Sequence, residues 1–232
     1  VEEILIRSSN VGSVILAKKI GEQRFKKFID DAKLLQSPDL EIEEVGSPYK
    51  IKWDKCKLET VSFGHGITTT PIQAAAVYSA MTNGGKLVKP SFIKKRKTTE
   101  AQILISTETS KVINSILRKV VSSEHGTAYF ADKNGYYVGG KTGTAEGYAN
   151  NTDRINTFIS VFPTKKPKYT LLVMLENPQI NKDLIYDYRG VKTKAPYNTS
   201  GWNSVYTAGK IIDKIGPILA INSKEFTSHY VV

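Results

Sequence analysis

Residues 135–146 read Gly-Tyr-Tyr-Val-Gly-Gly-Lys-Thr-Gly-Thr-Ala-Glu, and the conformation of this stretch decides the fold class. The stretch satisfies two patterns. Over 135–142 it matches G-x-x-x-x-G-K-[ST], which is typical of a phosphate-binding loop, and the apolar run at 171–176 ends in a carboxylate as an accompanying strand often does. It also fits a β-strand that presents Lys141-Thr142-Gly143-Thr144 at the edge of a sheet. The residues on either side must decide between the two.

Those flanking residues favour the strand. A phosphate loop needs a buried strand before it and a helix directly after its Lys-Thr pair, because the helix N-terminus holds the phosphates. Here 131–134 form a polar turn, 146–151 favour a loop, and the aromatic and β-branched residues 136–138 are predicted to be a strand. Nucleotide binding stays open as an alternative, for which magnesium-dependent binding of ATP or GTP is the test.

On a sheet edge, each residue of the Lys141 motif has a chemical use. Gly143 lacks the Cβ that would block an extended acyl substrate from pairing along the strand. Lys141 supplies positive charge and, with the hydroxyls of Thr142 and Thr144, can bind a carboxylate. The backbone N–H of Thr144 would form one half of an oxyanion hole.

Helices are predicted before this motif and at the end of the chain. Two N-terminal helices break near Gly21, and Thr70 followed by Pro71 indicates the start of a helix that stops at Gly84. The two N-terminal helices and two later helices are predicted from apolar residues at helical spacing. The positions are Val11, Val14, Ile15, Phe25, Phe28, Ile29, Ala32, Val112, Ile113, Ile116, Leu117, Val120, Val121, Val205, Ala208, Ile212 and Ile215.

Strands follow the Lys141 motif. Residues 157–162 and 169–175 are β-branched, aromatic and apolar, and a hairpin over 163–168 would pair them antiparallel. The last helix would cover one face of that sheet, which gives an α+β architecture. Residues 37–60 are expected to form a long surface connection, and 86–97 an extended segment.

The bulk composition limits the possible functions. The 232 residues are 40% hydrophobic, which suffices for one core or most of a larger domain. Cys56 is the single cysteine, so no internal disulfide or cysteine-rich metal site is possible. The net charge of +11 is scattered, and Lys94-Lys95-Arg96-Lys97 has no interleaved aromatics, so we expect no nucleic acid partner.

A second motif precedes the Lys141 motif. Ser8-Ser9-Asn10 matches the pattern S-x-N and stands before a predicted helix. Alone, serine and asparagine at such a place are ordinary helix caps. Four segments together, however, resemble the class B penicillin-binding proteins in spacing and order. They are Ser8–Gly12, Phe63–Gly66 with Thr70–Gln73, Asn83–Gly85, and Gly140–Glu146.

This resemblance implies a β-lactamase/transpeptidase-like fold, with a five-stranded antiparallel sheet flanked by helices. It implies that Ser8 relays a proton between the active-site lysine and the leaving amine. By the same resemblance, Asn10 orients the substrate amide, Lys141 serves the catalytic polar network, and 142–144 bind substrate. His65 stands where the family often has tyrosine or glutamine, so no proton-transfer role is assigned to it.

The family's nucleophile motif, S-x-x-K, lacks a fitting match. Its serine and lysine must share a helical face. Ser91 and Lys94 lie in a segment predicted to be extended, which puts them on opposite faces, and Ser47 and Lys50 lie in a charged connection; both also follow the second motif. We therefore expect no nucleophile in this chain. Residues 1–232 are interpreted as the C-terminal portion of a transpeptidase domain whose N-terminal part is missing, inactive alone.

In the complete protein, the resemblance implies a peptidoglycan D,D-transpeptidase that transfers stem peptides ending in D-Ala-D-Ala and is acylated by β-lactams, without metal or cofactor. Asn177-Pro178 and Gly201-Trp202-Asn203 look most like the septal enzyme. Its expected partners are a membrane glycosyltransferase and division proteins at the periplasmic face of the inner membrane, with an anchoring helix outside this chain. A serine β-lactamase, a β-lactam sensor domain or a scaffolding role are the alternatives.

Overall fold

The computed structural model describes residues 1–43, 46–94, 101–146 and 154–221. Within these residues an antiparallel sheet of three strands lies at the centre of the molecule, in the order β3-β4-β5. The hairpin predicted over 163–168 is confirmed, since Phe162 pairs with Tyr169. The strands are β3 (Gly139–Glu146), β4 (Arg154–Phe162) and β5 (Tyr169–Glu176).

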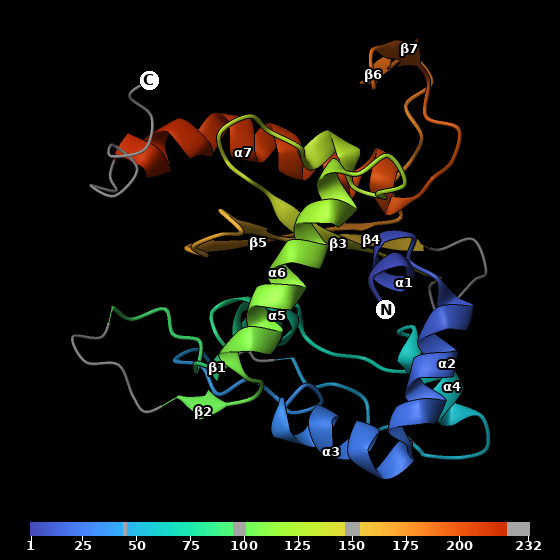
Figure 1. The fold of residues 1–232 in the computed structure, drawn as a ribbon, viewed down its shortest axis with the longest axis vertical. Coiled ribbons are helices and arrows are strands. Elements are labelled where there is room, and N and C mark those ends of the chain that lie inside the picture. Colours follow the sequence, from blue (N-terminus) through green and yellow to red (C-terminus); the bar gives the residue numbers. More distant parts are fainter. Residues whose placement is uncertain (44–45, 95–100, 147–153, 222–232) are drawn as a thin grey trace.

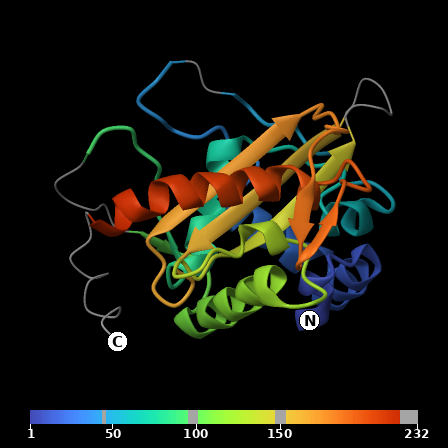
Figure 2. The ribbon, with the colours of Figure 1, turned by 90° about the horizontal axis from the view of Figure 1, so that it is seen from above.

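Helices cover both faces of this sheet, which confirms the α+β class. In Figure 1 the sheet is seen edge-on, with α7 on one side and α5 on the other, while α6 passes in front of the sheet and packs against the edge strand β3. Figure 2 shows α7 lying across the strands. None of the described helices is long and apolar enough to cross a membrane. The helices are α1 (Glu2–Ile6), α2 (Asn10–Ile20), α3 (Glu22–Asp31), α4 (Lys57–Ser62), α5 (Pro71–Thr82), α6 (Thr107–Ser122) and α7 (Ser204–Ile221).

The start of the central strand differs from the prediction. Residues 136–138 form a turn and its exit rather than a strand, and Gly135 and Tyr137 have positive φ values of 84° and 49°. Val138 is apolar because it is buried in the core, not because it pairs with a strand. The strand begins at Gly139 and runs through Lys141 and Thr142. The phosphate-loop interpretation is therefore wrong, because no helix starts after the Lys-Thr pair.

The helix predictions are confirmed in position and partly wrong in orientation. Thr70 caps α5 by accepting from the Gln73 N–H, and the apolar stripe of α7 is fully buried at Val205, Ala208 and Ile212. In α2 the predicted inner face points outward: Val11 is 72% and Ile15 51% exposed, while Gly12 and Ala17 are buried. Small residues lie inward there because α1 packs closely, with Ile4 against Gly12. In α6, Val112 is exposed as well.

The connecting segments differ from the prediction. Helix α4 begins inside the expected connection at 37–60, and a short helix, α1, precedes the two helices predicted at the N-terminus. In the segment expected to be extended, only β1 (Lys86–Leu87) is a strand, paired with β2 (Gln102–Ile103). Residues 95–97 of that segment lie outside the described residues.

Two glycines of β3 differ in what surrounds them, and this difference predicts different stabilities. In Gly140→Ala the new Cβ would lie 2.4 Å from Cζ of the fully buried Phe158 and 2.8 Å from the Ile159 carbonyl oxygen. We expect this change to lower the free energy of unfolding by about 1–3 kcal/mol, because a packed core resists an added methyl group.

Gly143→Ala is the matched control. Its Cβ would lie no closer than 3.9 Å to any atom, so the free energy of unfolding should change by less than about 0.5 kcal/mol. Urea unfolding followed by circular dichroism measures both variants. Equal losses of stability in the two would contradict the packing described here.

Candidate active site

The turn between α1 and α2 directs Ser8 away from the helix that follows. Ser9 is the N-cap of α2, and its Oγ accepts from the Gly12 N–H at 3.1 Å. Ser8 itself has a left-handed backbone with φ 55°. The ordinary capping role is therefore carried by Ser9, and the Ser8 hydroxyl is left to bond elsewhere.

The Ser8 hydroxyl meets Lys141, which is 133 positions later in the chain. Lys141 Nζ donates to Ser8 Oγ at 2.6 Å and to the Thr142 carbonyl oxygen at 3.0 Å. Burial in the cleft lowers the pKa of Lys141 from 10.5 to about 8. The Lys141 amine is still charged at neutral pH, but its pKa is close enough to neutral pH for the amine to exchange its proton.

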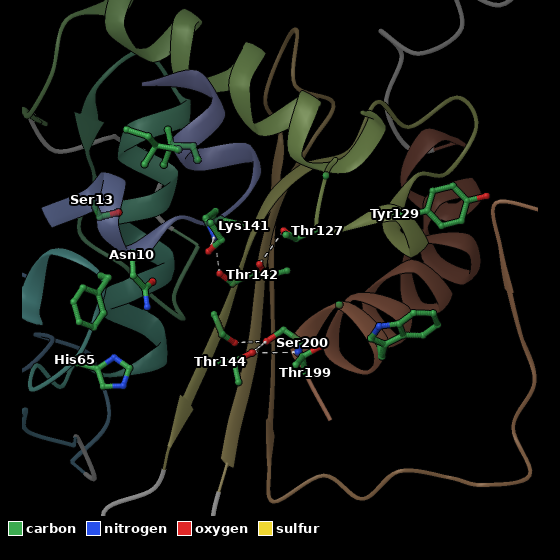
Figure 3. Close-up of a pocket in the computed structure, with 18 of the residues that line it drawn as sticks. Asn10, Ser13, His65, Thr127, Tyr129, Lys141, Thr142, Thr144, Thr199 and Ser200 are labelled. Atoms are coloured by element: carbon green, nitrogen blue, oxygen red, sulfur yellow. Dashed lines mark hydrogen bonds between the residues drawn. The ribbon is translucent and has the colours of Figure 1, made fainter. Parts of the chain in front are cut away.

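These residues lie in a cleft of about 680 Å³ between β3 and the helices α2 and α4 (Figure 3). The structure brings together all six site residues predicted from the sequence. Asn10 enters from the start of α2, and His65 lies near it with its ring centroid 5.2 Å from that of Phe63. The predicted residues in the cleft lining are Ser8, Asn10, Lys141, Thr142, Gly143 and Thr144.

A second set of hydroxyls, not predicted from the sequence, meets the threonines of β3. Thr142 and Thr144 share the face of β3 opposite Lys141, because side chains alternate along a strand. Thr142 Oγ1 lies 3.0 Å from Thr127 Oγ1, and Thr144 Oγ1 lies 2.9 Å from Ser200 Oγ. The sequence gave only a weak signal for these two hydroxyls. Thr127 follows a glycine, Gly126, at which an added Cβ would clash with the Val120 carbonyl oxygen of α6, and Ser200 precedes a segment noted only for its resemblance.

Aromatic rings form one wall of the cleft. Tyr188 packs against Tyr129 and Trp202, with ring centroids 5.1 and 5.2 Å apart. Tyr188 is carried by a short hairpin of β6 (Tyr186–Tyr188) and β7 (Val191–Thr193). Arg189 holds this hairpin, since it lies 4.7 Å over the Tyr129 ring and donates to the Ser123 carbonyl oxygen. Single aromatics in irregular segments have no periodicity, so the sequence did not indicate this wall.

The two serines that match S-x-x-K lie outside the cleft. Ser47 is exposed and shares a hydrogen bond with Ser37, and Ser91 is bonded to Glu41. Neither is part of the cleft lining. Within the described residues, no group of three or more histidine, cysteine, aspartate or glutamate side chains could bind a metal ion.

A family model described as the penicillin-binding protein transpeptidase domain matches residues 1–198. The chain belongs to this family. Among curated transpeptidase-family relatives, the probable peptidoglycan D,D-transpeptidase FtsI of Caulobacter vibrioides is 31% identical over 96% of this chain and 38% of its own length. Stage V sporulation protein D of Bacillus subtilis is 32% identical over 76% of this chain and 30% of its own. The chain thus spans less than half the length of these two relatives.

Solved structures of the family share the fold. Penicillin-binding protein 3 of Mycobacterium tuberculosis, in complex with ampicillin, superposes with a TM-score of 0.78 at 22% identity, over 93% of this chain and 51% of that one. The transpeptidase domain of penicillin-binding protein 3 from Burkholderia pseudomallei gives 0.77 at 22% identity, over 94% and 64%. The β-lactamase/transpeptidase-like fold expected from the sequence is confirmed, but the central sheet of the described residues has three strands and not the five that the resemblance implied.

The lowered pKa of Lys141 predicts a pH-dependent stability. Because the folded pKa of about 8 lies below the ordinary 10.5, the unfolded chain binds more protons between these values. The free energy of unfolding should therefore gain a contribution as pH rises from about 8 to about 10.5, and that contribution is absent below pH 8. Urea unfolding at several pH values, with Lys141→Met beside the wild type, measures it.

Lys55→Met is the control, because Lys55 is exposed and is not part of the cleft lining. It should keep the rise in stability that Lys141→Met loses. A rise of the same size in all three proteins would show that Lys141 is not its source.

Proposed function

We propose that the protein containing this chain is a serine-type peptidoglycan D,D-transpeptidase that acts at the division septum. The observation that carries the proposal is the hydrogen bond between Lys141 and Ser8 in a cleft that also holds Thr142 and Thr144. The names of relatives add support, since one is called a probable peptidoglycan D,D-transpeptidase FtsI.

In this proposal Ser8 moves a proton during acyl transfer, and Lys141 holds Ser8 in place. A nucleophilic serine, which we place upstream of this chain, attacks the penultimate D-alanyl carbonyl, and D-alanine leaves. Ser8 passes a proton to the leaving amine, and Lys141 holds the Ser8 hydroxyl through its 2.6 Å bond. The acyl group then passes to the amine of a second stem peptide, and Asn10 orients the substrate amide.

The substrate carboxylate is assigned to the other face of β3. The hydroxyls of Thr142 and Thr144 donate to it, and Gly143 leaves room for the substrate backbone. Since the nearest atom to a Cβ at position 143 is 3.9 Å away, a methyl group there would point into open space along the strand. The backbone N–H of Thr144 supplies one donor of the oxyanion hole.

The remaining assignments concern the complete protein. We place residues 1–232 in the C-terminal portion of its transpeptidase domain, with β-lactams as acylating ligands. A membrane glycosyltransferase and division proteins are the proposed partners. The proposed location is the periplasmic face of the inner membrane, with an anchoring helix outside this chain.

Acylation by a fluorescent penicillin tests the proposal in the full-length protein. Lys141→Ala should abolish labelling, and Ser8→Ala should lower the acylation rate constant about 100- to 10,000-fold, as for loss of a positioned proton-transfer group. Circular dichroism should show that both variants are folded. Lys192→Ala, an exposed lysine outside the cleft, is the control and should label as the wild type does.

Normal labelling of Lys141→Ala would contradict the assignment of the site. Rapid hydrolysis of the wild-type acyl-enzyme would indicate a β-lactamase instead of a transpeptidase.

The position of Ser47 and Ser91 outside the cleft gives a separate prediction. Peptide mass spectrometry of the penicillin-treated protein should find the acyl group on neither residue, because neither hydroxyl can reach a ligand beside Lys141. An acyl group on either serine would overturn the location of the active site.

A further inference from the structure

Ser200 is a buried serine that contacts the edge strand of the cleft at three points. Its side chain is fully buried within a single 3₁₀ turn at 200–202. Its hydroxyl donates a short hydrogen bond to the Gly143 carbonyl oxygen and lies 2.9 Å from Thr144 Oγ1. Its backbone N–H donates to the same Thr144 oxygen at 3.3 Å. Two neighbouring residues of the Lys141 motif, Gly143 and Thr144, are therefore held by one residue that lies 57 and 56 positions later in the chain.

Each of the two hydroxyls, Ser200 and Thr144, has a single hydrogen, and this limits which hydrogen bonds can exist at the same time. A serine or threonine hydroxyl has one hydrogen to donate and two lone pairs to accept. While Ser200 donates to the Gly143 carbonyl, Thr144 must donate to Ser200 Oγ, so the Thr144 hydrogen points away from the cleft. If Ser200 rotates its hydrogen to Thr144 Oγ1, the Thr144 hydrogen becomes available to an anion in the cleft. The 2.9 Å separation permits either direction.

We propose that Ser200 is a positioning residue that switches the Thr144 hydroxyl between an internal hydrogen bond and the ligand carboxylate. In the occupied cleft the hydrogen bonds run from Ser200 to Thr144 and from Thr144 to the carboxylate. Such a chain polarises the middle hydroxyl and makes it a stronger donor than an isolated threonine. This inference rests on the proposed function, which places a carboxylate beside Thr144.

Ser200 differs from the other hydroxyl at this face. Thr142 pairs with Thr127 through a single contact at 3.0 Å. Thr144 receives both a hydroxyl contact and a fixed N–H from Ser200, so its oxygen is held in place whichever way its hydrogen points. We therefore assign discrimination of the anion to the Ser200–Thr144 pair.

Acylation of the full-length protein by benzylpenicillin and by its methyl ester tests the switch, because the ester lacks the negative charge. Ser200→Ala should lower the acylation rate constant for benzylpenicillin about three- to tenfold, the effect of one hydrogen bond, and leave that for the ester unchanged. Ser160→Ala is the matched control. Ser160 is also fully buried and donates to a backbone oxygen, that of Leu171, but it lies outside the cleft lining, so both rate constants should be unchanged.

A double-mutant cycle separates positioning from a structural role. In a Thr144→Val background, Ser200→Ala should cause no further loss of the preference for benzylpenicillin over the ester, because Ser200 acts through Thr144. Equal losses with both ligands, additive losses in the cycle, or a faster reaction of Ser200→Ala would overturn the inference.

The two proposals fail in distinguishable ways. A wild-type protein that benzylpenicillin does not acylate would refute the proposed function itself. Should Ser200→Ala fail to fold, Thr144→Val alone still tests the inference: it must lower the ratio of the two rate constants at least threefold, and an unchanged ratio refutes the switch.

Discussion

The hydrogen bond between Lys141 and Ser8 joins the two halves of the cleft, and the remaining structure is arranged so that this bond can form. Ser8 comes from the turn between two helices and Lys141 from the edge strand of the sheet. The Ser8 hydroxyl can bond to Lys141 because Ser9, and not Ser8, caps the next helix. The strand can offer Lys141 because a buried core behind it fixes its position, and that core includes Phe158 directly beneath Gly140.

The alternation of side chains along β3 separates two kinds of chemistry. Lys141 lies on one face, where burial lowers its pKa and the Ser8 hydroxyl oxygen accepts a hydrogen bond from its amine. Thr142 and Thr144 lie on the other face, where neutral hydroxyls surround them. A desolvated amine suits proton exchange, whereas polarised hydroxyls suit the recognition of an anion. One edge strand therefore presents side chains for both kinds of chemistry, an amine on one face and hydroxyls on the other.

Gly140 and Gly143 of β3 also have different roles. Gly140 is needed by the core, because any side chain there would meet Phe158, while the space beside Gly143 is open. The same residue type therefore stabilises the fold at one position and admits a ligand at the other. The aromatic wall near Tyr188 limits the cleft on the side away from α2, and Arg189 fixes that wall to the loop after α6.

The sequence alone predicted the order of the main helices and strands, the edge-strand motif and the S-x-N motif before α2, since helical and strand periodicities and short motifs depend on neighbouring residues. It was wrong about 136–138 and about the inner face of α2, because burial against distant elements, not local pattern, makes those residues apolar or small. Only the folded structure shows that the Ser8 hydroxyl, already assigned to the site by the resemblance, contacts Lys141, and that Ser200 holds Thr144. Contacts across 133 and 56 positions depend on how the helices and the sheet pack together, and no local pattern encodes them.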